Sequence, residues 1–429
     1  MSEKPRNPDH VRRVNQPAVD NEVVKAHLTE LVLPAVYNQV AYYQSLGLRA
    51  RILSLPVMVG GLLTLLWQQI RGVCELTRVL NRDGALWFGP VKVSQAAVSK
   101  RLQSLPYEVM RSVFVALLPV LKERWLVRQR PLPAAIQAAK EHFPEIYAVD
   151  GSSLEALFRK LKALQDVPPG QLGGKICTVI DLLVRLPSQV WYKAEAQAHD
   201  TGFLADILSL VHAGTLWIFD RGFYDFAFFG DVVERGGQFI TRLKSNAVYQ
   251  VQSVLTDTDR VRDRIILLGG TQPCRYPLRL IEVRFGQTWY RYLTSVLNPA
   301  FLPPSVVVEL YRQRWHIEEA FLVVKRLLNL AYLWTGSLNG ILLQVWATWL
   351  FFAVLVDLGD AVANELMLPF DRISLEMVFR GLYHFHRAFE KGLATDPVKY
   401  LADPQNRDLG VVKRLRPGVT RLNFDGSEV

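Results

Sequence analysis

The sequence contains few cysteines. Cys74, Cys177 and Cys274 are the only three among 429 residues, and they lie far apart along the chain. The sequence has no Cys-x-x-Cys pair and no cluster of cysteine with histidine, which excludes the usual patterns of structural zinc sites and disulfide frameworks. Because this cysteine usage is typical of a reducing compartment, we expect a cytoplasmic protein.

The sequence also lacks a hydrophobic run long enough to cross a membrane. Of two apolar segments, residues 52–67 are interrupted by Pro56, Gly60 and Gly61, and the other is Ile341–Val356. Both are shorter than the roughly 20 apolar residues that a spanning helix requires. We therefore expect two buried core helices and no membrane-spanning segment. The polar N-terminal stretch MSEKPRNPDHVRR has no apolar centre and does not resemble a secretory signal.

The charge of the chain is strongly positive. Lysine and arginine number 50 against 40 aspartates and glutamates, giving a net charge of +10 and a pI near 9.5. Such an excess favours a polyanionic partner, either nucleic acid or an anionic membrane surface, and does not choose between them.

The length allows two or three domains. The local composition and hydrophobic pattern predict polar tails, together with a helical N-terminal region and a helical C-terminal region that flank a central segment. The tails are residues 1–20 and 405–429. The N-terminal region is residues 21–135, and the C-terminal region is residues 336–404.

A polar, basic segment, Val91–Pro106, is the candidate DNA-binding element of the N-terminal region. It fits the second helix of a helix-turn-helix, in which Lys100 and Arg101 would face a groove of DNA. An ordinary amphipathic helix with a solvated basic side is an equal alternative, because no preceding helix and turn show the expected spacing.

From Glu145 the pattern becomes mixed. Apolar strands and short helices predict the order strand, strand, strand, helix, strand, helix, strand. Residues 246–303 then show strand-like alternation and predict a β-strand insertion. Pro303 and Pro304 end this insertion and begin a long helix.

Three acidic residues stand out by position. Asp150 and Asp220 each end an apolar strand, and Glu318 lies on the helix that follows the insertion. Taken alone, each aspartate is also typical of a turn or a helix cap. Together, the three carboxylates fit a site for two divalent cations about 3.5–4 Å apart. Oxygen ligands favour Mg²⁺ or Mn²⁺.

The helix around Glu318 reads YRQRWHIEEAFLVVK from Tyr311 to Lys325. Tyr311, Arg314, Glu318 and Lys325 share one stripe about 60° wide on a regular helix. The neighbouring flank is apolar. The alternative to a functional stripe is an ion pair between Arg314 and Glu318 within the helix.

This spacing, Y-(2)-R-(3)-E-(6)-K, resembles the signature of DDE transposases of bacterial insertion sequences, in the insertion-sequence-four type. The blocks AVDGSS, IFDRGFYD and FITRLKS resemble the segments around the family's first and second aspartates. The resemblance implies an α/β fold with a ribonuclease-H-like catalytic core at residues 140–335, interrupted by the β insertion and flanked by helical regions.

The resemblance also implies roles. Asp150, Asp220 and Glu318 would hold two Mg²⁺ or Mn²⁺ ions, and Tyr311, Arg314 and Lys325 would hold DNA phosphates. A tryptophan of the insertion stacks a flipped base in some relatives. Trp289 is the candidate here, with Tyr290 or Tyr292 as alternatives and a core position for Trp289 as another.

The implied function is cut-and-paste DNA transposition. The enzyme would cleave transposon ends and join the 3′-hydroxyls to target DNA, as a homodimer in the active complex. A metal-dependent nuclease of the same fold that does not transpose is the second reading, and a DNA-binding relic of a transposase is the third.

Overall fold

The structure is a computed structural model. It describes residues 22–70, 72–154, 174–195, 198–328, 330 and 337–412. The tail predicted at residues 1–20 lies outside this range. The prediction of a tail from residue 405 is wrong for its first residues, because Val411 is buried and pairs with Ile373.

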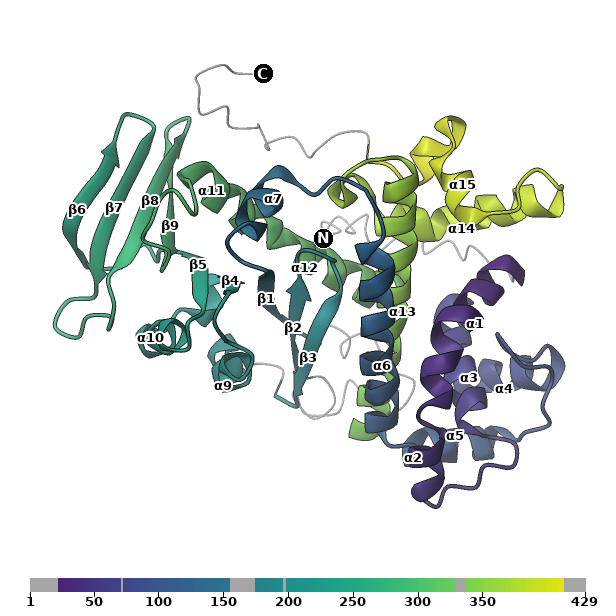
Figure 1. Cartoon of the computed structure of the whole chain (residues 1–429). Helices are drawn as coiled ribbons and strands as arrows, with labels where there is room; N and C mark the ends of the chain where they lie inside the picture. The colour runs from purple at the N-terminus through teal and green to yellow at the C-terminus, as the bar shows by residue number, and fades with distance from the viewer. Residues whose placement is uncertain are drawn as a thin grey trace, which may run out of the picture.

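A mixed β-sheet of nine strands forms the centre of the fold (Figure 1). Its strand order is β3-β2-β1-β4-β5-β9-β8-β7-β6. Strand β1 runs parallel to β4, and β4 runs parallel to β5, whereas every other neighbouring pair is antiparallel. The strands are β1 (Glu145–Ser153), β2 (Lys175–Asp181), β3 (Pro187–Lys193), β4 (Thr215–Phe219), β5 (Gln238–Arg242), β6 (Tyr249–Asp257), β7 (Val261–Leu268), β8 (Leu278–Phe285) and β9 (Thr288–Thr294).

The first five strands follow the order predicted from the sequence. Every residue of β4 is buried, since its sequence TLWIF is apolar and both faces of the sheet are covered there. One face packs on α9 (Leu204–Leu208) and α10 (Phe226–Glu234), and the other packs on the main helical core.

Strands β6 to β9 lie within residues 246–303, where the sequence predicts strands, and they extend the same sheet. Strand β9 pairs with β5, which makes the insertion continuous with the central strands. Its outermost strand is β6. Nearly all of its residues are exposed, so it lacks the buried face that produces a clear alternation.

Helices precede and follow the sheet. They include α1 (Glu22–Tyr37), α2 (Val40–Ser45), α3 (Leu55–Trp67), α4 (Val73–Arg82), α5 (Gln95–Ser104), α6 (Tyr107–Leu126), α7 (Ala134–Lys140), α11 (Pro304–Gln313), α12 (Trp315–Leu322), α13 (Leu338–Glu365), α14 (Leu375–Glu390) and α15 (Pro397–Ala402).

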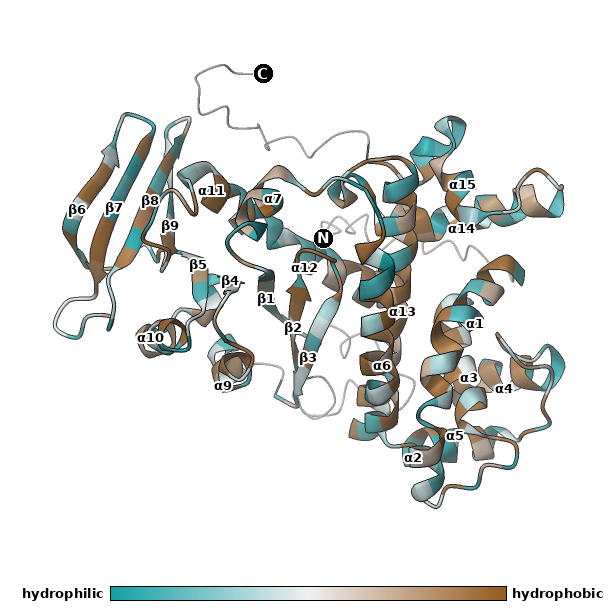
Figure 2. Cartoon of the chain, in the orientation of Figure 1, coloured by the Kyte–Doolittle hydropathy of each residue, from teal (hydrophilic) through white to brown (hydrophobic). Residues whose placement is uncertain are grey.

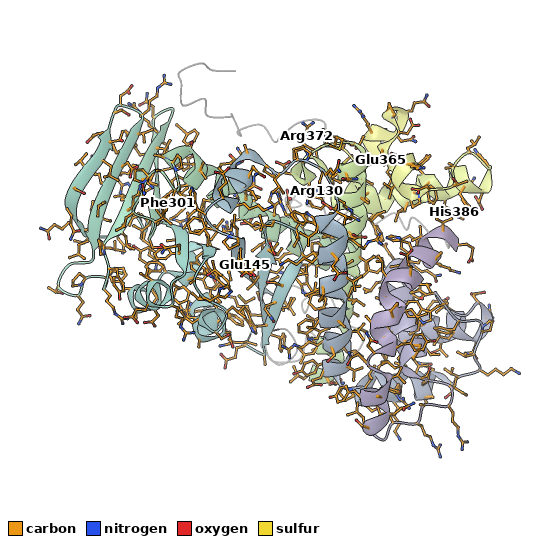
Figure 3. The ribbon with its side chains drawn as sticks, viewed as in Figure 1. Arg130, Glu145, Phe301, Glu365, Arg372 and His386 are labelled. Atoms are coloured by element: carbon orange, nitrogen blue, oxygen red, sulfur yellow. The ribbon has the colours of Figure 1, made fainter. Side chains whose placement is uncertain are left out.

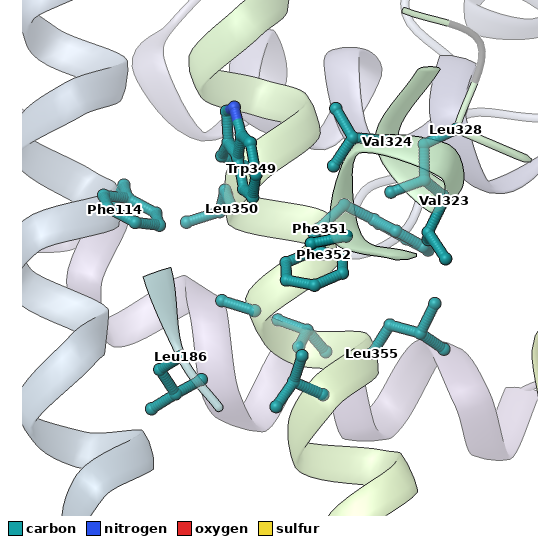
Figure 4. Close-up of a cluster of buried hydrophobic side chains, with 14 of the residues drawn as sticks. Phe114, Leu186, Val323, Val324, Leu328, Trp349, Leu350, Phe351, Phe352 and Leu355 are labelled. Atoms are coloured by element: carbon teal, nitrogen blue, oxygen red, sulfur yellow. The ribbon is translucent and has the colours of Figure 1, made fainter. Parts of the chain in front are cut away.

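The N-terminal and C-terminal helices, predicted as separate regions, pack on each other. Helix α13 contacts α6, α3 and α5 as well as α14 and α15. Figure 2 shows the apolar colouring along α6 and α13, which lie side by side. In the close-up of Figure 4, Trp349 and Leu350 of α13 lie near Phe114 of α6. The helices before and after the sheet therefore share one core.

Helix α13 is long and apolar enough to cross a bilayer by length and composition alone, but its most apolar window is wholly buried within the protein. The sequence prediction of buried core helices at residues 52–67 and Ile341–Val356 is confirmed, since α3 and α13 bury nearly all of their residues. The apolar surface of α13 is covered within a single chain.

The candidate helix-turn-helix does not have the usual geometry. Residues 83–94 separate α4 from α5, whereas the motif joins its helices by a turn of roughly three or four residues. The Arg101 guanidinium donates to the backbone carbonyls of Leu53 (3.0 Å) and Arg49 (2.7 Å), and it also contacts the Tyr43 hydroxyl. Arg101 thus holds the loop before α3 instead of facing outward as expected. Lys100 on the same helix is exposed.

Buried ion pairs join α6 and the segment after it to α13. Arg128 donates to Asp357 at 2.6 Å and to Asp360 at 2.9 Å. Arg130, labelled in Figure 3 beside the C-terminal helices, also pairs with Asp360. These carboxylates are almost fully buried, so each depends on its arginines for compensation.

We expect Asp360→Ala to lower the free energy of unfolding by about 3–5 kcal/mol, because the buried Arg130 guanidinium loses its carboxylate partner and Arg128 loses one of its two. Glu365→Ala, at the exposed end of the same helix, should change it by less than about 0.5 kcal/mol. Urea denaturation of both variants measures the difference. Equal losses would contradict a structural role for this network.

Candidate active site

Three carboxylates from distant parts of the chain surround one guanidinium. Arg314 Nη1 lies 2.6 Å from Asp150 Oδ2, and its Nη2 lies 2.8 Å from Glu318 Oε1 and 3.8 Å from Asp220 Oδ1. The Arg314 side chain is only 8% exposed. The acids line a cavity of about 480 Å³ that also includes Ser152 and Lys325.

The fold explains how the acids meet. Asp150 lies in β1 and Asp220 directly follows β4, and these two strands are parallel neighbours. The carboxyl ends of parallel strands meet at the same edge of a sheet. Helix α12 carries Glu318 and packs on β1, which completes the group predicted from the sequence.

The helix that carries the signature is less regular than predicted. It tightens at Arg314, where the N–H of Arg314 bonds to Tyr311 O and the N–H of Ile317 bonds to Arg314 O. It then widens into a π-helical turn at Val323–Leu327. Tyr311, Arg314, Glu318 and Lys325 nevertheless all reach the same cavity or the acids beside it.

Burial and charge shift the protonation of this group. Burial raises the pKa of Asp150 to about 7, with Asp220 and Glu318 adding to the rise and Arg314 opposing it. For Arg314, burial lowers the pKa, but the carboxylates of Asp150 and Asp220 outweigh it and raise the pKa above its ordinary value. The guanidinium is therefore a permanent positive charge inside the cluster.

Tyr311 is tied to the second aspartate. Its hydroxyl donates to Asp220 Oδ1 at 3.2 Å, and its ring meets the ring of Tyr292 edge-on at 5.5 Å. Burial raises the pKa of Tyr311, and the negative charge of Asp220 raises it further. The hydroxyl thus stays protonated and orients the carboxylate.

Lys325 reaches the end of β1. Its ammonium donates to the Ser153 carbonyl at 2.8 Å and contacts the Ser152 hydroxyl. Burial lowers the pKa of Lys325 to about 8, although Asp150 opposes the shift. The ammonium lies beside the acids without pairing directly with them.

The aromatic candidates of the insertion divide between two faces of β9. Tyr290 and Tyr292 lie on the face toward Tyr311, and Arg242 lies 5.4 Å over the Tyr290 ring. Trp289 points to the opposite face, where Arg262 lies 4.4 Å over its ring. The geometry therefore places Tyr290 and Tyr292, but not Trp289, on the face toward Tyr311.

Two further residues beside the site were not singled out in the sequence. Arg242 ends β5 within the FITRLKS block, and its buried Nε atom has no hydrogen-bond partner. Trp315 follows Arg314 directly and is 50% exposed. The position of Arg242 at the end of the strand next to β4 was the one signal in the sequence that pointed to it.

The three acids are the residues predicted to bind metal ions. Their hard oxygen donors suit Mg²⁺ or Mn²⁺. Within the part of the chain that the structure describes, no three His, Cys, Asp or Glu side chains are arranged closely enough to hold a metal ion. The Arg314 guanidinium lies between the carboxylates. Their oxygen atoms are suitable ligands for a divalent cation when this side chain moves away.

Comparison with known proteins agrees with this site. Residues 141–353 match the family model described as a transposase DDE domain, a range that includes all three acids. This part of the chain is therefore similar to a transposase DDE domain.

Two proteins that are similar to parts of this chain are described as proposed transposases. A protein of Sinorhizobium fredii named y4zB is 24% identical over 180 residues, which cover 40% of this chain and 50% of the relative. A protein of Geobacillus stearothermophilus, for insertion sequence element IS5377, is 22% identical over 291 residues, which cover 67% of this chain and 73% of the relative. The chain is thus similar to two proteins with transposase names, and it spans about half the length of the first of them.

We expect Arg314→Ala to destabilise the fold by about 2–4 kcal/mol, because three neighbouring carboxylates lose their shared counter-charge. Magnesium should restore much of this loss, since a cation that binds only the folded state stabilises it. Thermal unfolding with and without MgCl₂ measures both effects. The matched control is Arg312→Ala, which breaks a half-exposed pair with Glu309. A variant that gained no more from magnesium than the wild type would contradict the assignment.

Proposed function

We propose that this protein is a cut-and-paste DNA transposase of the insertion-sequence-four type, with a ribonuclease-H-like core. The observation that carries the proposal is the convergence of Asp150, Asp220 and Glu318 on one guanidinium at the edge of the sheet. The strand order β3-β2-β1-β4-β5, in which β4 and β5 run parallel to β1, supports the core assignment.

The proposed chemistry is phosphodiester hydrolysis followed by strand transfer. Asp150, Asp220 and Glu318 would hold two Mg²⁺ or Mn²⁺ ions, which when bound activate the attacking hydroxyl and stabilise the leaving oxygen. Tyr311 keeps Asp220 oriented through its hydroxyl.

Arg314 has two roles in this proposal. In the free protein it neutralises the acids. In the complex its planar fork would bind a DNA phosphate near the scissile bond, and Lys325 would bind another.

The proposed partners are the transposon ends and the target DNA. The net charge of +10 supports a polyanionic partner. Tyr290, beneath Arg242 and on the face toward the acids, is the proposed platform for a flipped base. We propose a homodimer in the active complex, because two ends must be cut in concert, and a cytoplasmic location.

We expect Asp150→Ala, Asp220→Ala and Glu318→Ala each to abolish nicking of a transposon-end duplex while leaving its binding largely intact. The carboxylates face the reaction centre and are not DNA anchors. Glu319→Ala is the matched control, since Glu319 pairs with His316 and lies outside the cavity. Gel assays of nicking and strand transfer in Mg²⁺ measure the outcome.

The same assays separate the alternatives. Near wild-type nicking by any of the three variants would refute the role of that residue. Nicking without strand transfer by the wild type would identify a nuclease that does not transpose, and DNA binding without nicking would identify a relic.

We expect Lys325→Ala to weaken binding of cognate and scrambled ends by similar factors, because a phosphate contact carries no sequence information. The slope of log affinity against log salt should flatten by about 1. Since the pKa of Lys325 lies near 8, its charge is present below pH 8 and is lost as the pH rises through that value. Wild-type affinity should therefore fall between pH 7 and pH 9 more steeply than that of the variant.

Titration of a labelled end fragment at several salt concentrations and pH values tests this prediction. Lys391→Ala, at the exposed end of α14, is the control and should leave both slopes unchanged. An unchanged salt slope for Lys325→Ala would refute the phosphate contact.

A further inference from the structure

A fourth carboxylate lies against both strand ends that carry the aspartates. Asp200 begins the short 3-10 helix Asp200–Phe203, and its side chain reaches Gly151 and Gly222. A Cβ atom added at Gly151 would lie 2.0 Å from Asp200 Oδ1, and one added at Gly222 would lie 2.3 Å from Asp200 Oδ2. The carboxylate therefore occupies the space that side chains at these two positions would need.

Both glycines belong to the segments that place the acids. Gly151 directly follows Asp150 in β1, and Gly222 lies two residues beyond Asp220 at the end of β4. Neither glycine has a backbone φ in the left-handed region, so conformational freedom does not require glycine at either position. Glycine is required at both positions because the Asp200 carboxylate occupies the space that a Cβ atom would need.

The charge of Asp200 is compensated away from the acids. Lys175 Nζ lies 2.7 Å from Asp200 Oδ1 and also donates to the Ala198 carbonyl at 2.7 Å. Lys175 pairs with Ser153 in the sheet and thus belongs to the neighbouring strand β2. A negative charge can therefore lie close to Asp150 and Asp220 without joining their cavity.

We propose that Asp200 is a positioning residue, whose carboxylate, wedged between Gly151 and Gly222, sets the separation of the two strand ends that carry Asp150 and Asp220. Its effect on catalysis rests on the function proposed above. Its effect on packing does not.

A double-mutant cycle tests the wedge directly. Gly222 is the better probe, because the three atoms nearest to its added Cβ all belong to Asp200. We expect Gly222→Ala to lower Tm by about 3 °C or more, because the methyl group collides with the carboxylate. In the Asp200→Ala background the same substitution should lower Tm by no more than about 1 °C. Additive losses would overturn the proposal.

Kinetics then test the positioning role. We expect Asp200→Ala to lower the rate constant of nicking about 10²-fold, since small displacements of reacting groups are costly, while the Kd for a transposon end stays unchanged. Asp200→Asn has the same shape and should recover most of the rate. An Asn variant as slow as the Ala variant, or a weakened Kd with an unchanged rate constant, would overturn the role.

Lys175→Met separates the wedge from the ion pair. If the pair with Lys175 were the whole role of Asp200, this substitution would slow nicking as much as Asp200→Ala does. We expect a smaller loss. The stability cycle needs no cleavage, so a wild-type protein that failed to cut DNA would refute the proposed function and leave the wedge testable.

Discussion

The site depends on one electrostatic arrangement, the guanidinium of Arg314 between three carboxylates. Strand β1, the end of β4 and helix α12 each contribute one acid. Charges at hydrogen-bond distance in a poorly solvated cavity interact more strongly than they do in water, and two of these contacts are within 3 Å. Without Arg314, repulsion between the carboxylates would destabilise this arrangement. The residue thus assembles the acids before any substrate arrives.

The helical body supports this arrangement from behind. Phe321 of α12 packs edge-on against Trp349 of α13 at 6.1 Å. Helix α13 is in turn fixed to α6 by an apolar interface and by buried ion pairs such as Arg128 with Asp357. The position of the Glu318 helix therefore depends on contacts between the two ends of the chain, which explains why the N-terminal and C-terminal regions share a core.

Local patterns in the sequence predicted the elements and the acids. Apolar strands that end in aspartate, and the spacing from Tyr311 to Lys325, depend on neighbours along the chain and are visible without a structure. The contact between Arg314 and Asp150 could not be predicted, because the local sequence is the same whether Arg314 pairs with Glu318 alone or also contacts Asp150. The face occupied by Trp289 depends on the register of β9, which one residue of slip would reverse. Arg101 and Asp200 act through contacts with distant segments, and no periodicity marks such contacts.

The balance of charge in the cavity limits what can enter it. When all groups are ionised, the three carboxylates exceed Arg314 and Lys325 by one negative charge, although the protein as a whole carries +10. A phosphate approaching the acids would be repelled locally, even though the net positive charge of the protein favours polyanions. If the protein acts on DNA as proposed, added positive charge must accompany the phosphate. Movement of the Arg314 guanidinium from the carboxylates to the phosphate increases the positive charge that must be added, because the carboxylates then lose their counter-charge. Binding of DNA and of divalent cations at this site should therefore favour each other, as a consequence of the same four side chains.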